Sequence, residues 1–269
     1  MPEAFKKRYK IAFEFNGCNF FGTQKQPDKR TVQNELEKAL CTLIKDNVSI
    51  IPSGRCDSQV SAKYMTAHFD CFDITQIYRL DNFLYKLNCI LPCDIKVLCI
   101  EEKERTFHAQ KQAKYKHYRY TIQNDHVASV FSDLCLFYPY FDLDIDKINA
   151  ILSHIEGYHD FSSFKSQNNN PYNDCEIYYA KATKKRVGNH DFIYIDIIGN
   201  RFLYNMIRII VAEILYILRN KLDACYMKCV LEKKNRKYAQ YLAQAKGLSL
   251  EYVGYDEVSE YISNLQKGN

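Results

Sequence analysis

Hydrophobic and polar residues alternate in several short stretches of the first half, a period-two pattern that predicts β-strands. The predicted strands cover residues 9–15, 48–51, 65–69 and 95–100. Two further stretches, 32–44 and 80–87, carry apolar residues at helical spacing; Thr31 is a plausible N-cap of the first, and Leu91-Pro92 closes the second. The order strand, helix, strand, loop, strand, helix, strand is typical of helices packed on an antiparallel sheet, in a split βαβ-like arrangement.

The second half begins near Thr106 and repeats this plan, which predicts two parts, 1–105 and 106–269. A strand near 114–122 opens it, and its alternation places two sets of side chains on opposite faces. One set is Tyr118, Tyr120 and Ile122, and the other is His117, Arg119 and Thr121. The remaining predicted elements are a helix over 145–155, strands over 177–183 and 192–198 joined through Gly188-Asn189, a long helix over 202–218, two short helices and a strand over 248–255. No linker rich in Pro, Gly or Ser separates the halves, so we expect an α/β (α+β) fold in which both halves share one continuous antiparallel sheet flanked by helices.

The longest apolar segment, 202–218, contains Asn205, Arg208 and Glu213. These polar residues favour a buried helix over a membrane span. A buried Arg is costly unless it is paired, so Arg208 should have a carboxylate partner; Glu213 or another structural acid is one candidate.

Composition narrows the function classes. The 269 residues are 47% hydrophobic, enough for a substantial core, and the net charge of +5 permits a polyanionic partner without requiring one. Eleven cysteines, no Cys-x-x-Cys and no signal-like N-terminus predict a reduced, cytoplasmic chain. The pairs Cys89/Cys93 and Cys225/Cys229 lack a His placed to complete a tetrahedral zinc site, so no metal is expected.

Residues 53–62 form a predicted loop between two strands and carry Arg55 and Asp57. An Arg close to a carboxylate keeps it ionised, which suits a nucleophile or a base better than an acid. Taken alone, such a stretch is more often a turn in which the Asp accepts a backbone hydrogen bond.

Other polar segments are compatible with RNA. Near the strand at 114–122 lie four cations, Lys111, Lys114, Lys116 and Arg119, for which phosphate contact or simple solvation are the two interpretations. A polar loop over 165–173 contains Asn168, Asn169 and Asn170, which suit phosphates or sugars, although a solvated loop explains them as well.

Short motifs spread over residues 9–255 follow one another in the order found in the tRNA pseudouridine synthase A family, which the chain resembles. They are Asn16-Gly17, Phe21-Gly22-x-Gln24-x-Gln26, Thr31-Val32-Gln33, Leu36-Glu37-x-Ala39-Leu40, Gly54-Arg55-x-Asp57, Leu87-Asn88-x-x-Leu91-Pro92-x-Asp94-Ile95, Phe107-His108-Ala109, Tyr118-x-Tyr120, Asp160-Phe161-Ser162-Ser163-Phe164, Asn200-x-Phe202-Leu203-x-x-Met206-Ile207-Arg208 and Ala245-x-Gly247-Leu248.

The resemblance implies two halves similar to RNA-recognition domains, a homodimer, and isomerisation of uridine to pseudouridine at positions 38 to 40 of the tRNA anticodon stem-loop, without cofactor or metal. It implies that Asp57 is the catalytic carboxylate, assisted by Arg55 and paired with Arg208, and that Tyr118 packs on the uracil. The residues expected to contact RNA are Phe107, His108, Ala109, Gln110, Lys111, Asn168, Asn169 and Asn170.

The chain departs from the family pattern near the Asp57 loop. Cys56, Ser58 and Gln59 replace the usual Thr, Ala and Gly, Thr23 replaces a Trp, and Gln110 replaces an Arg. Gln at a position that Gly usually occupies puts the loop shape in question. Two alternatives therefore stay open: a catalytically impaired paralogue that binds or helps to fold tRNA, and a general RNA-binding module.

Overall fold

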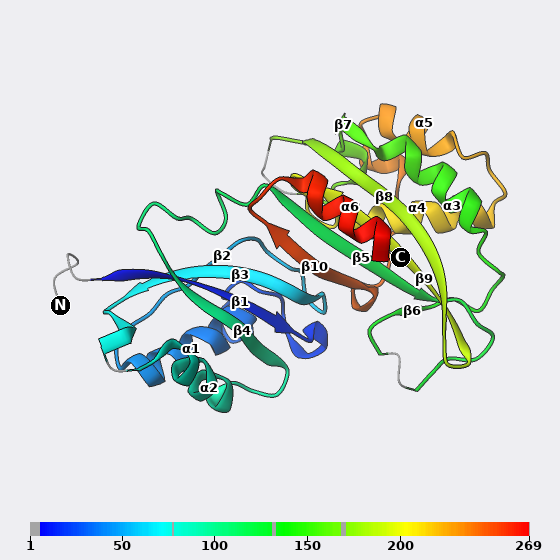
Figure 1. Cartoon of the computed structure of the whole chain (residues 1–269). Helices are drawn as coiled ribbons and strands as arrows, with labels where there is room; N and C mark the ends of the chain where they lie inside the picture. The colour runs from blue at the N-terminus through cyan, green and yellow to red at the C-terminus, as the bar shows by residue number, and fades with distance from the viewer. Residues whose placement is uncertain (1–5, 77, 131–132, 168–170, 269) are drawn as a thin grey trace. The chain divides into compact units, whose positions relative to one another are not determined.

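The computed structural model describes residues 6–76, 78–130, 133–167 and 171–268. The chain divides into two compact units (Figure 1). Unit 1 comprises Met1–Lys114 and Leu250–Tyr255, and unit 2 comprises Tyr115–Ser249 and Asp256–Asn269.

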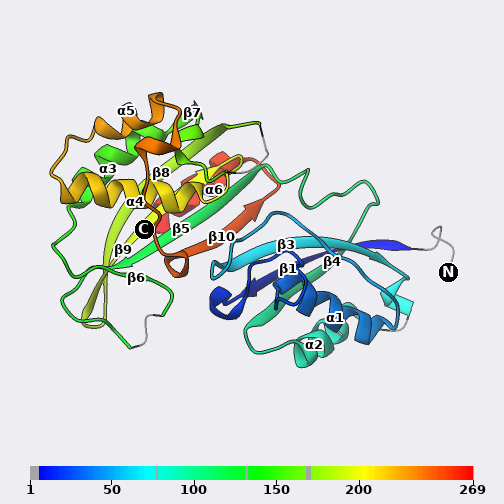
Figure 2. The ribbon, with the colours of Figure 1, turned by 180° about the vertical axis from the view of Figure 1, so that it is seen from behind.

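Unit 1 is a mostly antiparallel sheet covered by two helices. Its strands run in the order β4-β1-β3-β10, and β1 is antiparallel to both β3 and β4. The helices α1 and α2 lie together on one face of this sheet (Figures 1 and 2). The elements are β1 (Lys7–Phe15), η2 (Gly17–Asn19), α1 (Val32–Ile44), β2 (Ile51–Pro52), β3 (Ser61–Cys71), η3 (Ile74–Gln76), α2 (Leu80–Ile90), β4 (Ile95–Lys103) and, from Leu250 onward, β10 (Leu248–Gly254).

The sequence of α1 explains its limits. The Thr31 side chain accepts a hydrogen bond from the Asn34 N–H and so caps the first turn. Lys45 ends the helix in the left-handed conformation, with φ 56°. Leu36 and Leu40, at helical spacing, are fully buried against the sheet.

Unit 2 has the strand order β5-β9-β8-β7, with antiparallel neighbours, and the short β6 lies parallel to β5. Helix α4 lies on one face and the C-terminal helix α6 on the other, as the two opposite views show (Figures 1 and 2). The elements are β5 (Tyr115–Gln123), β6 (Leu136–Phe137), α3 (Ile145–Leu152), η4 (Ser153–Ile155), β7 (Gly157–Asp160), η5 (Ser162–Phe164), β8 (Asp174–Val187), β9 (His190–Gly199), α4 (Met206–Arg219), α5 (Tyr226–Glu232), η6 (Arg236–Tyr238), η7 (Ala245–Gly247) and α6 (Val258–Gly268).

The predicted alternation along β5 is confirmed. The Tyr118 and Phe202 rings pack edge-on with 5.1 Å between their centroids, and the Tyr120 hydroxyl donates to the Gln244 carbonyl. On the opposite face, His117 and Arg119 both bind Asp196.

The expected mixed α/β class is confirmed, because both units are mostly antiparallel sheets flanked by helices. Three details of the predicted elements are wrong. The helix expected from residue 202 begins at Met206, because Asn205 is left-handed with φ 62°; the strand expected over 48–51 is reduced to Ile51–Pro52; and α6 was not predicted. No helix within the described residues is long and apolar enough to cross a membrane.

Candidate active site

The loop between β2 and β3, residues 53–60, carries a half-buried Asp57. Main-chain hydrogen bonds hold both ends of the loop, one to the sheet and one to another residue of the loop. The Ser53 N–H donates to the Thr66 carbonyl of β3 at 2.8 Å, and the Val60 N–H donates to the Asp57 carbonyl at 3.1 Å, which closes a tight turn. The turn fixes the main chain that follows Asp57.

A second segment, residues 20–23, holds this loop from outside and is called the clamp segment below. Thr23 binds both main-chain groups of Cys56: its N–H donates to the Cys56 carbonyl at 3.0 Å, and its Oγ1 accepts from the Cys56 N–H at 2.9 Å. Thr23 is 1% exposed and Cys56 is 6% exposed, so water cannot replace these bonds. The residue next to Asp57 is therefore fixed by a buried two-point contact.

The rest of the clamp segment contacts the following residues of the loop. The Phe20 carbonyl accepts from the Gln59 N–H and from the Ser58 hydroxyl, each at 3.2 Å. Gly22 has φ +91°, and a Cβ at this position would lie 2.7 Å from the Cys56 carbonyl oxygen. Only glycine allows the two segments to approach this closely.

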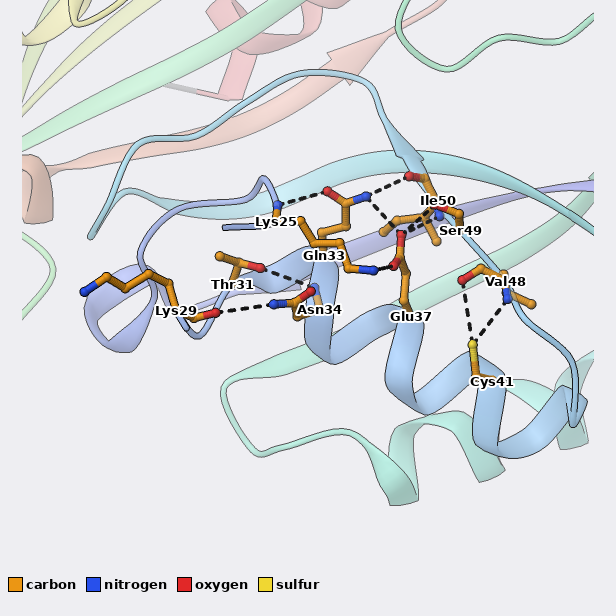
Figure 3. A network of polar contacts seen from close by, with 10 residues as sticks. All are labelled: Lys25, Lys29, Thr31, Gln33, Asn34, Glu37, Cys41, Val48, Ser49 and Ile50. Carbon is orange, nitrogen blue, oxygen red and sulfur yellow. Dashed lines mark hydrogen bonds and ion pairs between the residues drawn. The ribbon is translucent and has the colours of Figure 1, made fainter. Parts of the chain in front are cut away.

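Behind the clamp segment, a polar network links it to α1 and to the chain that leads into β2 (Figure 3). Gln33 Oε1 accepts from the Lys25 N–H at 3.1 Å, while Gln33 Nε2 donates to Glu37 Oε1 at 2.9 Å and to the Ile50 carbonyl at 3.2 Å. Glu37 Oε1 also accepts from the Ile50 N–H at 2.9 Å, and Glu37 forms an ion pair with Lys25. Burial alone would raise the pKa of Glu37, but the Lys25 ammonium and the hydrogen bonds hold it below its ordinary value. A charged carboxylate thus joins the two chain segments that lead to the loop.

The segment 107–111, expected to contact RNA, is fixed in unit 1 through Ala109. The Ala109 N–H donates to His68 Nδ1 at 3.1 Å, and the Tyr255 hydroxyl donates to the Ala109 carbonyl at 2.8 Å. Burial, followed by the nearby charge of Arg8, lowers the pKa of His68 to about 4, so its imidazole is neutral and can accept this bond at neutral pH.

Beyond Ala109, the side chains differ in exposure. Phe107 and His108 are half-buried, whereas Gln110 and Lys111 are exposed. His108 Nδ1 accepts from the Gln110 N–H at 3.2 Å and from the Lys111 N–H at 3.3 Å, so both exposed side chains start from an ordered turn.

The two expected site residues of unit 2 lie on β5 and α4. Tyr118 is 8% exposed and packs against Phe202. Arg208 is half-buried; its guanidinium donates to the Ala243 carbonyl at 2.8 Å and to Asn205 Oδ1 at 2.9 Å, both neutral acceptors.

The alternative of an Arg208–Glu213 ion pair is wrong. Glu213 is 2% exposed, and its Oε1 has no hydrogen-bond partner within the described residues. Burial raises the pKa of Glu213 to about 7. The pairing of Arg208 with Asp57 stays a prediction.

One of the four expected phosphate-binding cations has another role. Arg119 donates from Nε to Asp196 Oδ1 at 2.7 Å and from Nη2 to Asp196 Oδ2 at 3.0 Å. The same carboxylate lies 2.7 Å from His117 Nε2, and His117 Nδ1 lies 2.9 Å from the Tyr261 hydroxyl of α6. Burial favours the neutral form of Asp196, but His117 and Arg119 outweigh it and lower the pKa of this acid. The guanidinium of Arg119 therefore belongs to a network with Asp196 and His117 that reaches α6 through Tyr261, and phosphate contact by Arg119 stays a prediction.

Unit 1 brings several expected residues together. Arg55 and Gln110, 55 positions apart in the sequence, line one pocket of about 200 Å³ with Gln24. The exposed Arg55 forms no ion pair with any described residue. Convergence of Asp57 with Tyr118 and Arg208 stays a prediction, and Asn168, Asn169 and Asn170 lie outside the described residues. In the described part of the chain, no group of three or more His, Cys, Asp or Glu side chains is arranged to hold a metal ion.

Comparison with known proteins places this geometry in a family. A family model described as tRNA pseudouridine synthase matches residues 151–256. The tRNA pseudouridine synthase A of Geobacillus sp. (strain WCH70) is 38% identical over 253 residues, which cover 93% of this chain and 99% of that protein. The tRNA pseudouridine synthase A of Brevibacillus brevis is 33% identical over 93% of this chain and 100% of that protein. The tRNA pseudouridine synthase A 1 of Bacillus cereus is 37% identical over 93% of this chain and 99% of that protein. This chain belongs to the tRNA pseudouridine synthase A family.

Similarity to solved structures is weaker. The crystal structure of a Cbf5-Nop10-Gar1 complex aligns with 96% of this chain and 65% of that chain, with a TM-score of 0.34 and 10% identity. A likeness at this level adds nothing to the family assignment.

As a member of the tRNA pseudouridine synthase A family, the chain shows what its unusual loop residues do. Gln59, at a position where the family commonly has Gly, adopts φ +66°, so the loop keeps a glycine-like backbone at the cost of strain in a side-chain-bearing residue. Thr23, at the usual Trp position, supplies the oxygen that accepts from Cys56. An indole nitrogen is a donor only and cannot accept this bond.

Three residues of this arrangement were not predicted as functional: Thr23, Glu37 and His68. Thr23 was visible only as a departure from the family pattern. The His68 contact joins positions 41 apart, and the Thr23 contact joins positions 33 apart. Nothing in local periodicity indicates which main-chain group such a side chain will meet.

Proposed function

We propose that this protein isomerises uridine to pseudouridine at positions 38 to 40 of the tRNA anticodon stem-loop, with Asp57 as the catalytic carboxylate. Membership in a family of tRNA pseudouridine synthases makes it an isomerase that acts on tRNA. The observation that carries the finer assignment is the Asp57 loop, in which the residue before a half-buried carboxylate, Cys56, is held by two buried bonds to Thr23.

The reaction breaks the C1′–N1 bond, turns the base, and forms a C1′–C5 bond; the C5 proton leaves and N1 gains one, so no oxidant or reductant is consumed. An ionised, fixed carboxylate meets the needs of this chemistry. Asp57 attacks C1′, adds to the base or removes a sugar proton; all three roles require the same fixed position beside the nucleoside.

The target uridine lies in a helical stem, so the enzyme has to extrude it before Asp57 can reach the sugar. Arg55 is exposed at the entrance to the loop and has a guanidinium that suits the space left in the stem. Tyr118 is assigned to stacking on the uracil, because its ring is held edge-on by Phe202. Arg208 is assigned as the charge that keeps Asp57 ionised.

RNA contact outside the extruded nucleoside is assigned to the segment 107–111. Its anchor, Ala109, is fixed by His68 and Tyr255, so the exposed Gln110 and Lys111 are presented on an ordered turn. Ordered presentation reduces the conformational entropy lost on binding. Asn168, Asn169 and Asn170 are proposed as further RNA contacts. We also propose that the protein is cytoplasmic and forms a homodimer. Light scattering at micromolar concentration tests the dimer.

The test of this function uses unmodified tRNA transcripts and chemical mapping of pseudouridine. Product at one or more of positions 38 to 40, and at no other uridine, supports the proposal. Tight tRNA binding without product anywhere supports the impaired-paralogue alternative. Equal affinity for tRNA and unrelated RNA, without product, supports a general RNA-binding module.

A further inference from the structure

The pocket of about 200 Å³ beside the Asp57 loop is lined by both apolar and polar residues. Ile51, 43% exposed, and Pro52 form an apolar wall on β2. Gln24, Arg55 and Gln110 form the polar side. A flat heterocycle requires apolar surface together with hydrogen-bonding groups, and this lining supplies both.

Gln33 also lines the pocket, and its side-chain amide is already engaged. Gln33 uses its oxygen for the Lys25 N–H and its nitrogen for Glu37 and the Ile50 carbonyl (Figure 3). Gln33 therefore shapes the pocket without binding its occupant.

The carboxamides of Gln24 and Gln110 are different. Both residues are exposed, and neither side-chain amide has a hydrogen-bond partner within the described residues. Each is attached to a fixed main chain: Gln24 follows Thr23, which is bound to Cys56, and Gln110 follows Ala109, which is bound to His68. Two exposed amides without a hydrogen-bond partner in the described part of the chain thus line the same small pocket.

The size and chemistry of this space select the occupant. At about 200 Å³ it is below the range of about 300–1,000 Å³ typical of sites for drug-sized ligands, so it admits one ring system and not a whole nucleotide. A carboxamide donates and accepts side by side, which matches the edge of a nucleobase, whereas a phosphate only accepts.

We propose that this pocket binds one unpaired nucleobase of the substrate RNA, adjacent to the uridine presented to Asp57, and that Gln24 and Gln110 read its edge. The proposal rests on the proposed function, because Arg55 in the pocket wall is only two residues before Asp57. It gives Gln110, which stands where the family often has Arg, a base-reading role in place of the RNA contact expected of that Arg.

The test combines protein and RNA changes. Wild type, Gln110→Ala, Gln24→Ala and a control, Gln76→Ala, are assayed on an anticodon stem-loop and on versions with a single abasic nucleotide at each of the two positions on either side of the target. Gln76 is exposed in the same unit but does not line the pocket. Because both pocket residues are exposed, their substitution should leave the fold intact, which circular dichroism checks.

For intact RNA, Gln110→Ala should raise KM about tenfold, as expected for loss of an amide–base contact, and the control should not. One abasic position should raise the wild-type KM by a similar factor, and on that RNA the variant should lose nothing more. A Gln110→Ala effect of equal size on every abasic RNA, or no effect at all, overturns the proposal.

Failure of the proposed function gives a different result. If wild type forms no pseudouridine in any RNA, that function fails, and the pocket is tested by Kd for the same RNAs. A loss of affinity shared by Gln110→Ala and one abasic position then supports the pocket. Unchanged Kd across the set overturns it as well.

Discussion

The Thr23→Val substitution tests whether the clamp segment positions the Asp57 loop. Valine keeps the shape of threonine but replaces the oxygen that accepts from the Cys56 N–H at 2.9 Å with a methyl group. The bond from the Thr23 N–H to the Cys56 carbonyl is a main-chain contact and is retained. The change therefore removes one bond of the two-point contact and leaves the packing in place.

The magnitude follows from burial. Thr23 and Cys56 are 1% and 6% exposed, so no water can reach the abandoned N–H unless the loop moves. An unsatisfied buried donor costs about 1–3 kcal/mol. If the loop stays, the free energy of unfolding falls by about this amount; if it moves to reach water, the active geometry becomes a minor state and the rate falls by about 5- to 150-fold.

The assay measures both quantities for three proteins: wild type, Thr23→Val and Thr23→Ser. Urea unfolding gives the free energy, and single-turnover pseudouridine formation with saturating enzyme gives the chemical rate without product release. Thr23→Ser keeps the hydroxyl and should stay close to wild type in both. A Thr23→Val protein with wild-type stability and wild-type rate would refute the positioning role of Thr23.

Three further predictions concern other parts of the chain. Gln59→Gly should raise the free energy of unfolding by about 0.5–1 kcal/mol, because the relief of backbone strain at φ +66° outweighs the larger conformational entropy that glycine loses on folding. A lower free energy in urea unfolding would show that the loop is unstrained. Burial raises the pKa of Glu213 from 4.5 to about 7, so the folded state binds a proton that the unfolded state releases between these pH values. The free energy of unfolding should therefore fall by up to about 3 kcal/mol as the pH rises from 4.5 to 7. Glu213→Gln should flatten the stability profile between pH 4.5 and 7.5, and an unchanged profile would contradict this. Tyr255→Phe leaves the Ala109 carbonyl without its donor, so it should cost about 1–2 kcal/mol of stability and weaken tRNA binding. Wild-type affinity in a filter-binding titration would show that Tyr255 does not support the RNA-contacting turn.

Local patterns were sufficient for most of the fold. Thr31 caps α1 as its side chain predicts, and Leu91 ends α2 before Pro92. The start of α4 could not be predicted, because the left-handed Asn205 interrupts an apolar run that looks continuous in sequence. The amphipathic α6 was missed, although it is held by the contact of Tyr261 with His117, a residue 144 positions earlier.

The candidate site was predictable to the extent that it follows from motifs. Asp57 and Arg55 come from one such motif. The replacement of glycine by Gln59 put the loop shape in question, and Gln59 adopts φ +66°. Arg208 shows the opposite case, since burial arguments predicted a carboxylate and the bonds in its own unit go to a carbonyl and an amide oxygen. The sequence of a helix does not show which later segment will pack on it. Here the segment with Ala243 does so, and the Ala243 carbonyl accepts from Arg208.

The most direct test is the single-turnover rate of Asp57→Ala on an unmodified tRNA transcript, measured with tRNA affinity and with Asp46→Ala as an exposed carboxylate control. We expect no detectable pseudouridine with Asp57→Ala, nearly unchanged affinity, and wild-type turnover with Asp46→Ala. Pseudouridine formation by Asp57→Ala at a rate near that of wild type would contradict it.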